Sequence, residues 1–249
     1  MAPTKVMLME VGSFNPPTNM HLRLFEIARD YLDQTGLFKV IGGIVSPVHD
    51  LYGKKDLLPS THRCSMLRLA LNSSDWIYLS DWECKQEEWT RTKQVLQHHQ
   101  NTLNAILRNE GSQTENNSFE EQYWIREILK RCKNNDKVVV KLVCGGDLLE
   151  SFAVPGLWCD DDIEAIINDH GLVVISRSGS NPEKFIYESD ILTKYKRNIH
   201  IVTEWITNEI SSSKIRRALY RGQSVKYLIA DSVNEYIQNN RLFGVVEKH

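Results

Sequence analysis

The sequence predicts an α/β protein built on one parallel, doubly wound sheet with helices on both faces. Two observations indicate this fold. Short apolar runs alternate with segments of helical periodicity along the chain, and the runs are nearly continuous in apolar residues rather than regularly alternating with polar ones. The 249 residues are enough for one such domain. We expect a single domain over residues 1–249, with an insertion at about 109–136.

The first half of the chain begins with the apolar run 6–11, which predicts a buried strand. Residues 18–35 have helical spacing, with Thr18 as a candidate N-cap and Gly36 at the end of the helix. The run 38–46 predicts a second strand. The remaining elements of this half are a helix at 61–72, a strand at 76–79 and a helix at 87–107.

The second half opens with a polar, Gly- and Asn-rich segment, "NEGSQTENNS", that predicts a loop. A helix is expected at 119–132, with Phe119, Tyr123, Ile128 and Cys132 on its apolar side. The clearest central strand is 138–143. Further strands are expected at 172–175 and 199–202, and further helices at 212–221 and 225–239.

Composition excludes several classes of protein. Charged residues make up 25%, hydrophobic residues 41%, and the net charge is −2, so no overall field attracts nucleic acid or anionic membrane. No apolar run is long enough for a membrane span. The five cysteines are scattered without a CxxC pair, which argues against a disulfide framework or a zinc site and favours a reducing compartment. We expect an intracellular protein, with the cytoplasm favoured and the nucleus and mitochondrion left open.

The segment "GSFNPPTNMH", residues 12–21, follows the first strand and opens the first helix. Gly12 allows a ligand to approach the backbone, and the first helical turn offers N–H groups and a positive partial charge to an anion. His21 lies in that turn, where it can donate a hydrogen bond to a phosphate oxygen. The alternative is a histidine on the helix surface or at the edge of the core. The segment fits neither GxGxxG nor GxxxxGK[ST], which excludes those two nucleotide-binding motifs.

The segment "NEISSSKIRRAL", residues 208–219, starts a helix with capping serines. Lys214, Arg216 and Arg217 follow in the first turn, where positive charge opposes the helix dipole. A bound polyphosphate would offset that repulsion. A solvated basic helix start is the alternative.

Together the two segments resemble the nucleotidylyltransferase superfamily, whose motifs are G-x-F-x-P-x-[HT]-x-G-H and I-S-S-T-x-I-R. Met20 replaces the usual Gly of the first motif, and Ser213 replaces the Thr of the second. With Met20, the first motif resembles the eukaryotic nicotinamide/nicotinate mononucleotide adenylyltransferases. The resemblance covers about residues 6–243 and implies a Rossmann-like fold.

The resemblance also implies the site residues. The catalytic residues would be His21 and Arg216. ATP would be bound by Gly12, Ser13, Phe14, His21, Gly145, Asp147, Asn208, Ser213, Lys214, Ile215 and Arg216. The mononucleotide would be bound by Ser13, Lys54, Trp89, Thr92, Leu157, Trp158 and Glu204.

The implied reaction joins ATP to nicotinamide mononucleotide, and to the nicotinate form, giving NAD or its analogue and pyrophosphate by direct in-line attack. Magnesium would be held mainly by the substrate phosphates, without protein metal ligands. The resemblance implies a homo-oligomer, and neither nucleic acid nor a membrane is expected as a partner.

Three alternatives stay open at this point. The first is another adenylyl- or cytidylyltransferase of the superfamily, against which Trp89, Trp158 and Met20 count. The second is a class I aminoacyl-tRNA synthetase, for which the chain is short and lacks a lysine-rich KMSKS loop. The third is chaperone-like binding of client proteins, either beside catalysis or instead of it.

Overall fold

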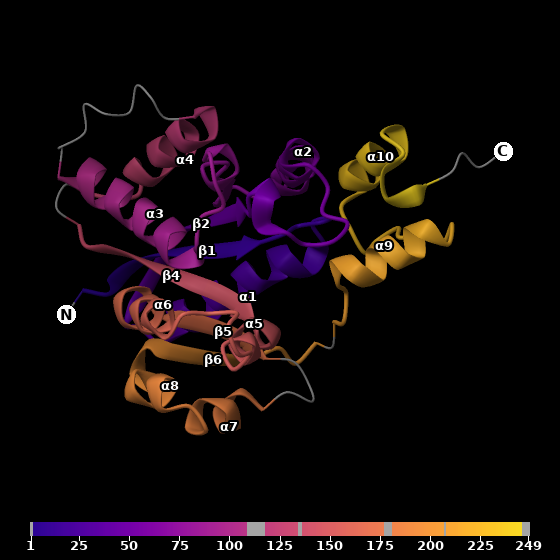
Figure 1. Ribbon diagram of the computed structural model, residues 1–249. Helices are drawn as coiled ribbons and strands as arrows, with labels where there is room; N and C mark the ends of the chain where they lie inside the picture. Colours follow the sequence, from indigo (N-terminus) through magenta and orange to yellow (C-terminus); the bar gives the residue numbers. More distant parts are fainter. Residues whose placement is uncertain (1, 109–117, 134–135, 177–180, 207, 246–249) are drawn as a thin grey trace.

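A six-stranded parallel sheet forms the centre of the computed structural model, which describes residues 2–108, 118–133, 136–176, 181–206 and 208–245 (Figure 1). The strand order is β3-β2-β1-β4-β5-β6, the arrangement of doubly wound nucleotide-binding sheets. The strands are β1 (Thr4–Gly12), β2 (Phe38–Pro47), β3 (Ile77–Leu79), β4 (Val138–Gly145), β5 (Leu172–Ser176) and β6 (Ile199–Thr203). The predicted fold class is therefore confirmed, and each predicted strand is found within two residues of its expected ends.

Helices cover both faces of the sheet. One face packs against α1 (Asn19–Gln34) and α2 (Ser60–Leu71). The other face carries α3 (Thr92–Leu107), α4 (Phe119–Leu129), α5 (Gly146–Ser151), α6 (Asp160–Ala165), α7 (Pro182–Tyr187) and α8 (Asp190–Lys194). The last two helices, α9 (Ser212–Tyr220) and α10 (Asp231–Asn239), pack with α2 in a third apolar cluster.

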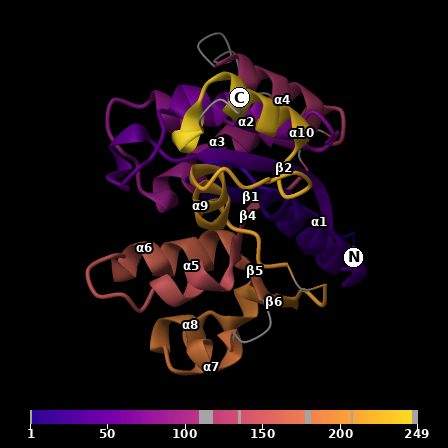
Figure 2. The ribbon, with the colours of Figure 1, turned by 90° about the vertical axis from the view of Figure 1, so that its right-hand side faces the viewer.

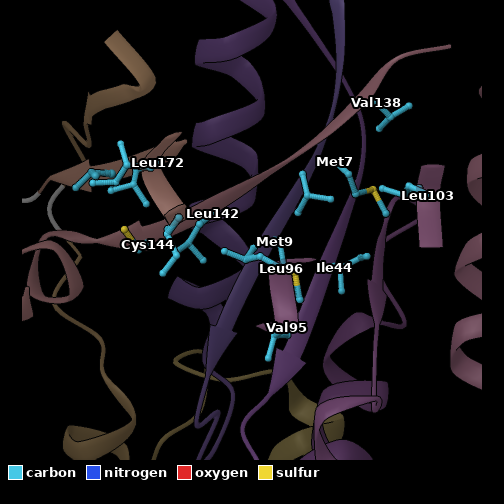
Figure 3. Close-up of a cluster of buried hydrophobic side chains, with 14 of the residues drawn as sticks. Met7, Met9, Ile44, Val95, Leu96, Leu103, Val138, Leu142, Cys144 and Leu172 are labelled. Atoms are coloured by element: carbon cyan, nitrogen blue, oxygen red, sulfur yellow. The ribbon is translucent and has the colours of Figure 1, made fainter. Parts of the chain in front are cut away.

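The alternation of side chains along β1 explains why its central residues, 6–9, are all apolar. Met7 and Met9 point into the cluster on the α3 side, where Figure 3 shows Met9 near Leu96 and Met7 near Leu103. Val6 and Leu8 point into the cluster on the α1 side. A strand buried on both faces cannot show polar alternation, so a continuous apolar run is the signature of a central parallel strand.

Two predicted helices begin later than expected. The helix expected at 87–107 starts at Thr92, because Gln86 and Arg91 have extended backbones. The Gln94 side chain then accepts a hydrogen bond from the Arg91 N–H and caps the helix start. The helix expected at 225–239 starts at Asp231, because Tyr227 has φ +68°, which lies outside the right-handed helical region.

The predicted apolar side of the helix at 119–132 was right for Ile128 and Cys132 and wrong for Phe119 and Tyr123. Phe119 and Tyr123 are exposed, by 75% and 42%, whereas Trp124, Ile125 and Ile128 are buried against α3 and the sheet. The 3–4 spacing of this buried set is typical of a helix face, but the sequence offered two such sets and only packing selects one. The loop expected before this helix lies mostly outside the described residues.

None of the helices within the described ranges combines the length and apolar character needed to cross a bilayer.

Candidate active site

The sheet order predicts where a ligand would bind. Chain connections leave in opposite directions on the two sides of the β1–β4 pair, so a crevice forms beyond the carboxyl ends of these strands. A cavity of about 270 Å³ lies at this place. Its walls come from the end of β1, the first turn of α1, the end of β4, the start of α5 and the start of α9. Figure 2 views the molecule from the side of α9, which lies in front of β1 and β4.

A second cavity, of about 330 Å³, lies between α1 and the segment that leads into β3. Arg23, Glu26 and Trp76 are among its lining residues. It lies at the amino end of β3, away from the strand ends where ligands of this fold bind, and it contains no predicted site residue. We therefore assign the candidate active site to the cavity at the β1–β4 pair.

The first corner of the site is the turn from β1 to α1. Phe14 has φ +45°, an uncommon conformation for a residue other than glycine and one that is often found at functional sites. Its ring is buried and meets the His21 ring edge-on, with the centroids 5.1 Å apart. A side chain at Gly12 would come within 3.3 Å of the Phe14 ring, so the glycine leaves room for this packing.

The orientation of His21 is fixed by the residue that caps its helix. Its Nδ1 lies 2.9 Å from the backbone nitrogen of Thr18 and 2.9 Å from the Thr18 hydroxyl. A backbone N–H can only donate, so Nδ1 accepts, and the proton of the neutral ring is on Nε2. His21 lines the cavity, and an Nε2–H group is a suitable donor to a phosphate oxygen.

The second corner is the start of α9, and it touches the first corner directly. The Ser212 hydroxyl donates to the Pro16 carbonyl at 2.8 Å. Arg216 Nη1 donates to the Asn15 carbonyl at 2.8 Å, and its Nη2 lies 3.3 Å from the Ser213 hydroxyl. Ser211 caps the helix by accepting from the Lys214 N–H at 3.3 Å. The two motifs that are far apart in the sequence therefore form adjoining walls of one cavity.

Lys54 reaches the same cavity from the loop after β2. Its Nζ donates to the Ser13 hydroxyl at 3.1 Å. Partial burial lowers the pKa of Lys54, the nearby Arg216 charge lowers it further, and Asp147 opposes both effects. An anion bound between Lys54 and Arg216 would relieve the repulsion between these two cations.

The end of β4 supplies a carboxylate. Gly145 ends the strand and Asp147 stands in the first turn of α5. A side chain at Gly145 would lie 2.6 Å from Asp147 Oδ1, so only glycine lets the carboxylate occupy this position. Both residues line the cavity, where the carboxylate can accept hydrogen bonds from hydroxyl groups of a ligand.

Arg63 of α2 was not predicted from the sequence, and it holds the site loops together. Its side chain is fully buried and donates to the carbonyls of Leu58 (2.8 Å), Ser13 (3.2 Å) and Val48 (2.7 Å). It also donates to Asp50 at 2.7 Å. Burial would raise the pKa of Asp50, but the hydrogen bonds from Arg63 and Ser60 hold it below its usual value. An arginine on an amphipathic helix is normally exposed, so the sequence carries no signal for this role.

Eight of the predicted residues line the cavity. They are Ser13, Phe14, His21, Lys54, Gly145, Asp147, Ser213 and Arg216. Of the other predicted ATP-binding residues, Gly12 pairs with β2, Asn208 accepts from the Ile210 N–H, and Lys214 pairs with Glu209. Ile215 is on the buried face of α9.

The remaining predicted mononucleotide-binding residues lie outside the cavity lining. Trp89 is 43% exposed, with its ring 5.9 Å from that of Tyr52, and Thr92 is the first residue of α3. Leu157 is exposed, and Trp158 donates to the Ser151 hydroxyl at 3.0 Å. The Glu204 carboxylate accepts from Arg23 at 3.1 Å.

The cavity groups suit charge neutralisation rather than covalent catalysis. Two cations, a histidine N–H, serine hydroxyls and the exposed amides of a helix start can surround several phosphate groups at once. Among the residues that the structure describes, no three His, Cys, Asp or Glu side chains are grouped as a metal site.

Fold and cavity together define a Rossmann-like nucleotide-binding protein. A family model described as cytidylyltransferase-like matches residues 9–218. The chain is 49% identical over 251 residues to nicotinamide/nicotinic acid mononucleotide adenylyltransferase 1 of Bos taurus, covering 97% of this chain and 89% of that protein. The chain belongs to the cytidylyltransferase-like family and, within it, to the eukaryotic nicotinamide/nicotinic acid mononucleotide adenylyltransferases.

Two further relatives agree with this placement. The nicotinamide-nucleotide adenylyltransferase of Drosophila melanogaster is 53% identical over 247 residues. That match covers 98% of this chain and 63% of the relative, so the chain spans less than two thirds of the fly protein. The nicotinamide/nicotinic acid mononucleotide adenylyltransferase 2 of Danio rerio is 38% identical over 298 residues, covering 96% of each.

Proposed function

We propose that the protein transfers the adenylyl group of ATP to nicotinamide mononucleotide, and to nicotinate mononucleotide, forming NAD or its nicotinate analogue and releasing pyrophosphate. The observation that carries this proposal is the direct contact between the two motif corners, through Arg216 and Asn15, at the switch point of the sheet. The names of the relatives support the choice of substrates.

The reaction is a single displacement at phosphorus. An oxygen of the mononucleotide 5′-phosphate attacks the α-phosphorus of ATP, and the bond from that phosphorus to the bridging oxygen of the β-phosphate breaks. Pyrophosphate leaves with the electron pair of that bond. No protein group is modified, so catalysis depends on holding the reactants in line and on stabilising the charge that develops.

Each predicted residue has a place in this scheme. His21 donates from Nε2 to the α-phosphate, and Arg216 with Ser213 and Lys214 holds the β- and γ-phosphates. Lys54 and Ser13 hold the phosphate of the mononucleotide. The backbone of Gly12 and Phe14 approaches the triphosphate, while Ile215 anchors α9 in the apolar cluster that it shares with α2 and α10. Gly145, Asp147 and Asn208 face the adenosine.

The pyridine ring of the mononucleotide would extend beyond the cavity toward exposed aromatic side chains. Trp89 offers a flat face for stacking and for cation–π attraction to the charged ring. Thr92 can bond its carboxamide or carboxylate, and Leu157 and Trp158 complete this side. Glu204, which pairs with Arg23 of α1, would lie nearer the adenosine.

We also propose that Mg²⁺ enters with ATP. Mg²⁺ usually keeps several waters and binds through substrate phosphates and one or two carboxylates. The donor set of the cavity fits a metal held mainly by substrate phosphates and water, because Asp147 is assigned to the adenosine and the described residues include no group of three metal-ligating side chains. A bound Mg²⁺ would supply charge neutralisation on the leaving pyrophosphate.

Three broader features are proposed with the function. The chain is one domain with an insertion at about 109–136, supported by the single sheet. It works as a homo-oligomer, as the family resemblance implies. It acts in the cytoplasm, which is supported by five free cysteines that suit a reducing compartment.

The test is pyrophosphate release from ATP in the presence of each candidate acceptor. Nicotinamide and nicotinate mononucleotides should both support turnover, whereas phosphopantetheine and choline phosphate should not. Turnover with either of the last two and with neither mononucleotide would overturn the proposal and point to another branch of the family.

A further inference from the structure

Glu10 is a buried carboxyl group in the cavity to which the scheme above gives no role. It lies on β1 and points to the same side as Val6 and Leu8, toward α1. The residue is 7% exposed and lines the cavity together with His21 and Asp147. Its Oε2 is buried and has no hydrogen-bond partner among the residues that the structure describes.

An ionised carboxylate in this position would be unfavourable in free energy, because a buried charge loses its hydration and here no hydrogen bond to the buried oxygen compensates for that loss. Burial raises the pKa of Glu10 well above its ordinary value, and the nearby Asp147 charge raises it further. The other titratable and charged groups around the cavity are His21 of α1, Lys54 of the loop after β2, Cys144 of β4 and Arg216 of α9. Burial and the Asp147 charge therefore both favour the neutral carboxylic acid form of Glu10, which can donate a hydrogen bond.

The position of Glu10 connects it to the nucleotide. Thr18 and His21 line the same cavity as Glu10. In the proposed function, the α-phosphate binds beside these two residues. An ionised Glu10 would repel a phosphate at this place, whereas the neutral acid can donate to a nucleotide oxygen and satisfy its own buried oxygen. We propose that Glu10 is an additional nucleotide-binding residue, which donates a hydrogen bond to the bound nucleotide from the floor of the cavity.

This inference rests on the proposed function. It predicts in addition that nucleotide binding is coupled to the uptake of a proton by Glu10. Where part of the Glu10 population is ionised, the nucleotide binds only the protonated fraction, so binding takes up a proton. Affinity then falls as pH rises through the pKa of Glu10, by up to about tenfold per pH unit. Lys54 also titrates in the alkaline range, so the measurement must separate the two groups.

The experiment is calorimetric titration of the full-length protein with α,β-methylene ATP, which cannot transfer its adenylyl group. Titrations run from pH 7 to 9.5 in buffers of different ionisation enthalpy, which reports the protons taken up. The variants are Glu10→Gln, which is always neutral and keeps a donor, and Glu10→Ala, which has none. Glu83→Gln is the matched control. Glu83 is another buried acid, with a pKa raised to about 8 by burial, but it does not line the cavity.

At pH 7 we expect Glu10→Gln to bind like the wild type and Glu10→Ala to bind roughly tenfold to a hundredfold more weakly, the effect of one lost hydrogen bond to a charged group. In the wild type and in Glu83→Gln, analogue binding should take up protons and should weaken at alkaline pH. Glu10→Gln should lose the part of both effects that comes from Glu10. Equal binding by folded Glu10→Ala and Glu10→Gln would overturn the inference, and so would absence of analogue binding to the wild type. Analogue binding without pyrophosphate release would overturn the proposed function alone.

Discussion

Arg216 Nη1 and the carbonyl oxygen of Asn15 are 2.8 Å apart, although the two residues are separated by 201 positions in the chain. Asn15 also donates from its side chain to the Asp56 carbonyl at 2.8 Å. One residue of the β1–α1 turn thus contacts both the start of α9 and the loop that carries Lys54. This network gives the proposed phosphate contacts fixed relative positions, which is the main requirement for in-line phosphoryl transfer.

Replacing His21 should test charge stabilisation at the α-phosphate. We expect His21→Ala to reduce kcat by roughly a hundredfold to a thousandfold, the usual effect of removing one preorganised donor. Circular dichroism and Tm should remain near wild type. His62→Ala is a suitable control, because His62 contacts Tyr236 on α10 and does not line the cavity. An unaltered kcat in His21→Ala would refute its catalytic role.

Arg216→Lys should separate charge from geometry. Lysine keeps the positive charge but cannot contact the Asn15 carbonyl and the Ser213 hydroxyl at once as the guanidinium does. We expect kcat/KM for ATP to fall by roughly tenfold or more, a loss of about 1.4 kcal/mol in transition-state stabilisation. The control is Arg217→Lys, at the exposed neighbouring position, which should leave kcat/KM for ATP unchanged. If both variants behave alike, Arg216 acts only as a surface charge.

Loss of Arg63 should destabilise the protein and weaken mononucleotide binding together. Arg63→Met would leave the carbonyls of Ser13, Val48 and Leu58 without their buried donor. We expect a loss of about 3 kcal/mol in the free energy of unfolding, measured by urea denaturation, and a higher KM for the mononucleotide.

Arg68→Met is the matched control for Arg63, on the same helix. Its guanidinium is half exposed and pairs with Glu120, so its loss should cost about 1 kcal/mol or less. A similar loss of stability in the two variants would contradict the role given to Arg63.

The stability of the protein should fall in mild acid partly because of His99. This residue of α3 is fully buried between the Val95 carbonyl and the Ser80 hydroxyl. Burial lowers its pKa to about 4. The unfolded chain, with a pKa near 6.5, then binds a proton that the folded protein excludes, so stability is complete above about pH 6.5 and decreases as pH falls toward 4.

Comparison of the wild type with His99→Gln should isolate this effect. Between pH 7 and pH 5 the wild type should lose about 2 kcal/mol more of its unfolding free energy than the variant, because glutamine does not titrate. Equilibrium denaturation at both pH values measures the difference. An equal loss in the two proteins would show that His99 does not contribute to acid unfolding.

Much of the fold followed from local sequence patterns. The strand at Val138–Gly145 and the helix at Asn19–Gln34 were predicted with small errors at their ends, since continuous apolar runs and the Thr18 cap are local signals. The errors arose where tertiary contacts set the backbone. Tyr227 adopts φ +68° within an otherwise helical pattern, and Trp124 rather than Tyr123 faces the core. Neither choice is encoded in spacing alone.

The candidate site shows the same division. His21 and Arg216 were identified from motifs, and the structure places both at one cavity. Arg63 and Glu10 carry no motif. The first is a charged helix residue that is buried among four hydrogen-bond acceptors. The second is a strand residue whose buried Oε2 has no hydrogen-bond partner in the part of the chain that the structure describes.

By itself the sequence determined the parallel sheet, the positions of its strands and the two segments able to bind phosphate, because apolar periodicity and helix-start chemistry are local properties of the chain. Only the tertiary structure decided that these segments adjoin, that Arg63 joins their loops and that Glu10 is enclosed beneath them. Such relationships depend on which residues distant in sequence become neighbours, and burial among those neighbours sets the proton affinity and the hydrogen-bonding of each group.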